Sequence, residues 1–181
     1  MHTLKVAATL AAALFLQLLL TRYFAFFRYL DLALVVTVYF ALQRVPIQGM
    51  LVGLIAGLGG DVVSGGILGV GGFSKTLIGY IIAISSVRLS LESPLARLAV
   101  VVLASVANTL LFVGLYQMLE QSQIPEQVLP FAGNWQELLK ATGWKALADF
   151  SAAVVCFALL DRLFHEHASA RRMAIKKRFY E

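Results

Sequence analysis

Charged residues are scarce in this chain of 181 residues. Asp, Glu, Lys and Arg make up 14% of it, whereas apolar residues make up 60%, and the mean hydropathy is +0.81. A soluble domain is about one quarter charged and about half apolar. A chain long enough for only one domain cannot bury so much apolar surface in its own core. The composition therefore excludes a soluble protein and predicts an integral membrane protein.

The residues that usually carry chemistry are also few. Cys156 is the only cysteine, so no internal disulfide can form. The chain has no HExxH, GxSxG or P-loop motif and no paired cysteines. We therefore predict no catalytic centre, no metal site and no cofactor. The pI near 9.6 does not indicate nucleic-acid binding, because six of the fifteen basic residues lie in residues 161–181, as in a cytoplasmic membrane flank.

Six apolar runs follow one another along the chain, and about twenty apolar residues are needed to cross a bilayer. The second run is short, and we expect it to gain length from residues 23–30, where Arg28 lies one helical turn before Asp31 and is spaced to pair with it. The fold class expected is an all-α bundle of six transmembrane helices in residues 1–165, with a basic tail in residues 166–181. The predicted spans are residues 4–20, 32–42, 47–63, 73–89, 98–119 and 146–164.

The basic residues indicate the orientation of this bundle. If both chain ends are cytoplasmic, ten basic residues lie inside and five outside, as the positive-inside rule favours. The N-terminal run is long and has no clear cleavage site, so we interpret it as a retained first helix rather than a signal peptide. The five outside residues are Arg22, Arg28, Lys75, Lys140 and Lys145.

The most unusual stretch is LIAGLGGDVVSGGILGVGG, residues 54–72, which has eight glycines and one aspartate in an apolar setting. Gly49, Gly53 and Gly57 recur every four residues, and Asp61 takes the next step, so all four share one broad helix face. Glycine lets helix backbones approach closely in lipid. Three interpretations stay open: packing of this span against a neighbouring span, a surface for another protein's helix, or the wall of a ligand cavity.

Asp61 needs a partner, because an ionised carboxylate facing lipid is costly. We expect it to fix the turn after the third span, either by accepting hydrogen bonds from glycine N–H groups or by pairing with Lys75. Gly65 and Gly69 would give that turn its tight backbone. Asn108 lies near the centre of the fifth span and is expected to hydrogen-bond across helices.

The first span has a second set of small residues. Alanines recur at four-residue spacing on one side of the helix, a pattern that also favours close helix contact. These positions are predicted to contact another helix or a partner protein. They are Ala7, Ala8, Ala11 and Ala12.

The run GMLVGLIAGLGGDVVSGGILGVGGFSKTLIGYI, residues 49–81, resembles the core of MreD, a bacterial rod shape-determining membrane protein. The likeness is carried by a glycine-rich span, an aspartate at its end, a small-residue turn and a following Gly-Tyr pair. One departure is that this chain has LGGD where the family often has leucines leading directly to the aspartate. The residues that match are Gly53, Gly57, Asp61, Gly65, Leu68, Gly69, Gly79 and Tyr80.

This resemblance implies a non-enzymatic scaffold of the cell-elongation machinery in the bacterial inner membrane. It implies direct contact with MreC and, in a larger complex, with MreB, RodA and a class B penicillin-binding protein, so that the protein helps to organise peptidoglycan synthesis. It also implies a fold similar to the S components of energy-coupling factor transporters. The alternative function is therefore a substrate-binding subunit for a vitamin-type molecule. An intramembrane enzyme would require Asp61, Asn108 and Asp149 to face one cavity.

Overall fold

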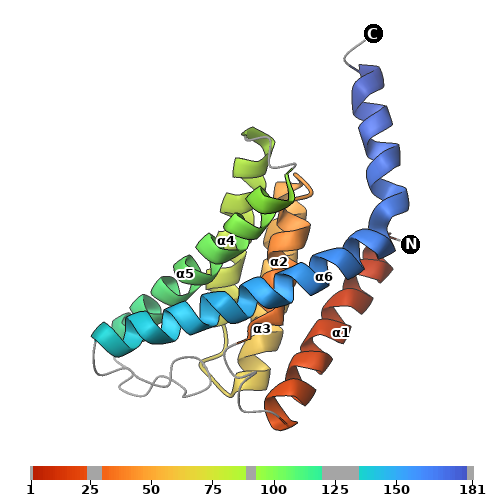
Figure 1. The fold of residues 1–181 in the computed structure, drawn as a ribbon. Coiled ribbons are helices and arrows are strands. Elements are labelled where there is room, and N and C mark those ends of the chain that lie inside the picture. The colour runs from red at the N-terminus through yellow and green to blue at the C-terminus, as the bar shows by residue number, and fades with distance from the viewer. Residues whose placement is uncertain (1, 24–29, 89–92, 120–134, 179–181) are drawn as a thin grey trace.

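The computed structural model describes residues 2–23, 30–88, 93–119 and 135–178. Every secondary-structure element within these ranges is an α-helix (Figure 1). The first helix begins at the end of the bundle that carries the turn between the second and third helices, and the last helix ends on that same side (Figure 1). The helices are α1 His2–Tyr23, α2 Leu32–Ala41, α3 Pro46–Ser64, α4 Val70–Arg88, α5 Pro94–Met118 and α6 Trp135–Arg178.

The short helix α2 is the centre of the bundle. All ten of its residues are buried, and it packs against each of the other five helices. Its sequence, LALVVTVYFA, is apolar on every side, which is typical of a helix with no exposed face. The hydroxyl of Thr37, near the middle of α2, donates to the carbonyl oxygen of Ala33 in the same helix at 2.7 Å.

Four helices are long and apolar enough to cross a membrane, namely α3, α4, α5 and the Leu139–Arg162 part of α6. Large aliphatic and aromatic side chains are exposed on the outside of the bundle, as in a lipid-facing surface. The protein is therefore an all-helical integral membrane protein. The apolar part of α1, Lys5–Leu20, is shorter than these four, and α2 is shorter still.

The second expected span, residues 32–42, agrees with α2 to within one residue, but it does not gain the extra length expected for it. At about 1.5 Å per residue α2 is about 15 Å long, roughly half the hydrocarbon thickness. It gains no helix from Leu30 and Asp31, which precede its first turn, and residues 24–29 lie outside the described part. Six complete spans, cytoplasmic chain ends and the S-component-like fold remain predictions.

Helix α6 is one helix of 44 residues. It begins well before the expected start at residue 146 and continues far beyond the expected end at residue 164 (Figure 1). Helix α6 is helical on both sides of residue 165, where the membrane domain is expected to end, and the division into a membrane domain and a separate tail remains a prediction.

The glycine stripe of α3 packs against α4. A Cβ atom built at Gly49 would lie 2.8 Å from the carbonyl oxygen of Gly79, and one at Gly53 would collide with the carbonyl group of Lys75. A Cβ at Gly57 would likewise collide with the backbone of Gly71. The two backbones touch at three successive turns, so this stripe is buried inside the molecule and is not a free lateral surface.

This packing makes a specific prediction about glycine substitutions in α3. Gly53→Ala and Gly57→Ala should lower the melting temperature of the purified protein in detergent, because the added methyl group must push α3 and α4 apart, an overpacking cost of about 1–3 kcal/mol. Gly60→Ala is the matched control, since nothing lies within 4 Å of its added Cβ. Equal melting temperatures for Gly53→Ala and Gly60→Ala would show that the backbones are not in contact.

Candidate functional site: a buried cluster of charges

Asp31 caps the first turn of α2 from inside the bundle. The first N–H groups of a helix have no intrahelical acceptors, and the buried start of α2 has no bulk water to supply them. One carboxylate oxygen of Asp31, Oδ1, accepts the N–H of Leu34 at 2.9 Å. The Asp31 residue as a whole is only 8% exposed, so this anion is held at the centre of the bundle.

Two lysines approach the other carboxylate oxygen of Asp31. The Nζ atom of Lys75, from α4, lies 3.0 Å from Oδ2, and the Nζ atom of Lys145, from α6, lies 3.9 Å from it. Both lysines are buried. Because lysine is almost never buried without a charged partner, Asp31 explains why these two ammonium groups are tolerated here.

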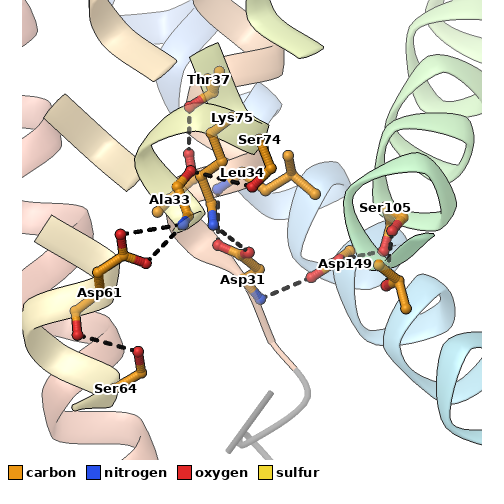
Figure 2. Close-up of polar contacts among 12 residues, drawn as sticks. Asp31, Ala33, Leu34, Thr37, Asp61, Ser64, Ser74, Lys75, Ser105 and Asp149 are labelled. Atoms are coloured by element: carbon orange, nitrogen blue, oxygen red, sulfur yellow. Dashed lines mark hydrogen bonds and ion pairs between the residues drawn. The ribbon is translucent and has the colours of Figure 1, made fainter. Parts of the chain in front are cut away.

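Asp149 completes the cluster from α6. Its Oδ1 accepts the backbone N–H of Asp31 at 2.8 Å, and its Oδ2 accepts the hydroxyl of Ser105 at 2.6 Å. Figure 2 shows Asp31 between Lys75 on one side and Asp149 with Ser105 on the other. Two carboxylates and two ammonium groups, whose formal charges cancel, thus join α2, α4, α5 and α6 at one point.

The cluster lies deep in the bundle. Ser105 is near the middle of the 25-residue helix α5, and Asp149 lies within the membrane-crossing part of α6. Ionisable groups at such depth are costly and are a reason to expect a functional role. The carboxylate oxygens of Asp31 and Asp149 are all partnered within the chain, so the arrangement acts first as a structural junction between four helices.

Asp61 forms a separate anion site at the start of α4. Its carboxylate accepts the N–H groups of Gly69 at 2.8 Å, Gly71 at 3.0 Å and Gly72 at 3.2 Å. A helix N-terminus favours a negative charge through its free N–H groups and its dipole. Of the two arrangements expected from the sequence, the structure therefore has the one with glycine N–H groups. Lys75 does not pair with Asp61, because its ammonium group is held by Asp31.

The turn between α3 and α4 has the backbone that glycine permits. Gly65 ends α3 with a φ of 65°, and Gly69 has a φ of 103°, both in the region that side chains disfavour. The hydroxyl of Tyr116 on α5 accepts the N–H of Ile67 at 3.0 Å and ties the turn to the bundle.

Asn108 and the alanines of α1 are the other two features predicted from the sequence. Asn108 is 1% exposed, and its Oδ1 has no hydrogen-bond partner in the described part of the chain, so this atom does not make the expected bond across helices. Ser105, one turn earlier, makes such a bond instead. The alanines of α1 are exposed on the outside of the bundle, whereas Leu10 of the same helix is buried in the core; they are Ala7, Ala8, Ala11 and Ala12.

Most of the charged cluster was not expected from the sequence. The positive-inside rule places Lys75 and Lys145 among the outside residues, and the sequence spacing pairs Asp31 with Arg28, which lies outside the described residues. A signal was present in Lys145 and Asp149, which are four residues apart and so share one helix face. The sequence indicates that the second run is short, but not that α2 begins inside the bundle, which brings Asp31 inward to meet that face.

The family model of the rod shape-determining protein MreD matches residues 3–148. The chain belongs to the MreD family. The match includes Asp31, Asp61, Lys75 and Lys145 and ends one residue before Asp149. Neither the curated proteins nor the solved structures gave a match. This MreD-family chain is therefore a rod shape-determining integral membrane protein.

The charged cluster predicts strong coupling between Asp31 and Lys75 in this MreD-family protein. Asp31→Asn or Lys75→Met alone leaves an uncompensated buried charge, which should cost about 3–5 kcal/mol of unfolding free energy. The double variant removes one charge of each sign and should cost clearly less than the sum of the two single variants.

The measurement is a double-mutant cycle of unfolding in detergent micelles. Arg97→Met is the control, because its ion pair with Asp161 is partly exposed and should be worth about 0–1 kcal/mol. Strictly additive costs for Asp31→Asn and Lys75→Met would contradict the ion pair.

Proposed function

We propose that this protein is a non-enzymatic scaffold of the cell-elongation machinery in the bacterial inner membrane, where it binds MreC and helps to organise peptidoglycan synthesis. MreB, RodA and a class B penicillin-binding protein belong to the larger complex. The observation that carries the proposal is the family match over residues 3–148, joined to a bundle whose buried carboxylates are partnered internally. Such a cluster stabilises an assembly without requiring a substrate.

The α1 helix offers the most suitable surface for a partner's membrane helix. The glycines of α3 are covered by α4, so they cannot serve this purpose. Alanines at 7, 8, 11 and 12 are exposed, and small side chains let a second helix approach closely enough for dispersion contacts to hold it in lipid. MreC, as a single-span protein, would place its helix along this face.

The basic end of the chain supplies a second, weaker contact. In the proposed orientation residues 171–178 lie near the cytoplasmic leaflet and carry Arg171, Arg172, Lys176, Lys177 and Arg178. Each basic residue close to an anionic membrane surface adds about 1 kcal/mol of attraction. This attraction would orient the scaffold rather than select its protein partners.

The experiment that tests the function is a pull-down from native membranes in mild detergent, with bound proteins and small molecules both identified by mass spectrometry. Recovery of MreC with other elongation proteins and without a stoichiometric metabolite supports the scaffold. Recovery of a vitamin-type molecule or of transporter ATPases instead would establish the S-component alternative, and a bound ligand would also raise the melting temperature.

The α1 surface gives a residue-level prediction. Ala8→Leu with Ala12→Leu should reduce the MreC recovered by roughly tenfold, equivalent to about 1.4 kcal/mol, because the larger side chains hold the partner helix away. The melting temperature should not change, since both alanines are exposed.

Ala99→Leu is the matched control, because Ala99 is an exposed alanine on α5. Full MreC recovery by the α1 variant would remove α1 as the binding surface while leaving the scaffold function open to another face. Loss of MreC by the Ala99 variant alone would move that surface to α5.

A further inference from the structure

The ammonium group of Lys145 is buried without a direct hydrogen bond. Its side chain is 9% exposed, and its ion-pair partner, Oδ2 of Asp31, lies 3.9 Å from Nζ. A hydrogen bond from nitrogen to oxygen needs a separation of about 2.7–3.2 Å, so this pair is held by charge alone. An ammonium group has several N–H donors and no acceptor. Within the described part of the chain, the donors of Lys145 have no acceptor in hydrogen-bond range.

A buried acceptor on α5 has the opposite deficit. Oδ1 of Asn108 has no hydrogen-bond partner among the described residues, and the residue is only 1% exposed. Native structures rarely leave such an oxygen unpaired, because its lost hydration is not regained. The hydroxyl of Thr109, the next residue, is no donor to it, since it bonds to the carbonyl oxygen of Ser105 in its own helix. Asn108 therefore needs a donor from outside α5.

The packing of α5 against α6 brings Asn108 to the level of Lys145. Two polar contacts join these helices, namely Arg97–Asp161 and Ser105–Asp149. The residue numbers rise along α5 as they fall along α6, so the helices are antiparallel. Asn108 lies three residues after the second contact on α5, and Lys145 lies four residues before it on α6. Both side chains therefore start about one turn from that contact, toward the beginning of α6.

The packing of α5 against α4 leads to the same place. The hydroxyl of Tyr116 accepts the N–H of Ile67, and Phe112, one turn earlier on α5, shares an apolar cluster with the first residue of α4. One further turn back along α5 is Asn108, which corresponds to the second turn of α4, where Lys75 begins. Both neighbouring helices thus place the unpaired oxygen of Asn108 at the level of the two buried lysines.

We propose that an ordered water molecule is bound at this point and bridges the ammonium group of Lys145 to Oδ1 of Asn108. The bridging group must accept a hydrogen bond from an ammonium N–H and donate one to an amide oxygen. Water does both, whereas a carboxylate only accepts and a second ammonium group only donates. Buried waters typically make about three hydrogen bonds to polar groups that lack other partners. Oδ2 of Asp31, at 3.9 Å from Nζ, gives this water its third partner.

The bound water makes Asn108 a part of the charged cluster, although the residue carries no charge. Two ammonium groups and two carboxylates lose most of their hydration at this depth, and the water returns some of it to the cation with the longer ion pair. Asn108 is then a positioning residue, because it holds the water beside Lys145. This role goes beyond the proposed scaffold function and does not depend on which partner the scaffold binds.

Replacement of Asn108 by leucine distinguishes a bridged amide from an unpaired one. Leucine is of similar size and has no acceptor. Asn108→Leu should lower the melting temperature of the full chain in detergent by about 3 °C or more, because it leaves the donors of Lys145 without the water. In a Lys145→Met background the same change removes only an unpaired polar atom, so the melting temperature should stay equal or rise. A similar loss in both backgrounds, or no loss with Lys145 present, would overturn the proposal.

Thr109→Val is the matched control for this cycle. It also removes a buried polar group from α5, but its hydroxyl bonds within its own helix, so its effect should be the same with Lys145 and with Met at that position. Asn108→Asp keeps the test decisive if Lys145→Met does not fold. Because aspartate retains the acceptor, this variant should melt above Asn108→Leu, and the reverse order would contradict a bridge to the ammonium group.

A structure of the full chain in lipid nanodiscs, at a resolution that shows ordered water, gives the direct result. The expected map has one water peak within hydrogen-bond distance of both Nζ of Lys145 and Oδ1 of Asn108, and the peak is lost in Asn108→Leu. Direct contact between those two atoms would exclude the bridging water, and so would density for a larger molecule at the same place.

Discussion

The start of α2 inside the bundle imposes a requirement that the surrounding helices meet. A helix start leaves N–H groups without acceptors, and hydrocarbon offers none. Asp31 supplies one acceptor and Asp149 another, but two carboxylates at one buried point need positive charge nearby. Lys75 and Lys145 provide it. The cluster is thus a consequence of a half-length helix, because each polar group in it compensates for the one before.

The glycine stripe sets the position from which one of those lysines acts. Gly53 lies against the backbone of Lys75, so the close approach of α3 to α4 fixes where the Lys75 side chain begins. One turn further along α3, Gly57 meets Gly71, and Asp61 then reaches the free N–H groups at the start of α4. Backbone packing and electrostatics are therefore parts of one arrangement, because the same contacts that bring the helices together place both charged sites.

Composition and periodicity predicted that this is a helical membrane protein and where most of its helices lie. They were a poorer guide to which polar side chains meet inside the bundle. The apolar runs predicted α3, α4 and α5 to within a few residues, because each is bounded by turns that glycine, proline or charge make visible in sequence. The partners of Asp61 were predicted only as a choice between glycine N–H groups and Lys75. Lys75 and Lys145 were assigned to the outside, since a lysine near the end of an apolar run usually marks an interface. In the structure both lysines are buried beside Asp31. The depth of Asp31 depends on how five helices pack around α2, and the sequence alone does not show that packing.

Two stripes of small residues in this chain have opposite surroundings, and the reason can be read from their neighbours. The stripe on α3 packs against a complementary stripe on α4, in which Gly71 and Gly79 are eight residues apart and Gly79 and Ala83 are four residues apart. Two such stripes, adjacent in sequence and joined by a tight turn, pack on each other before any partner is available. The alanines of α1 have no such counterpart next to them in sequence, and they are exposed. A small-residue stripe without a complementary neighbour in its own chain is therefore the better candidate for contact with another protein, which makes α1, and not the more prominent glycine run, the outward-facing surface.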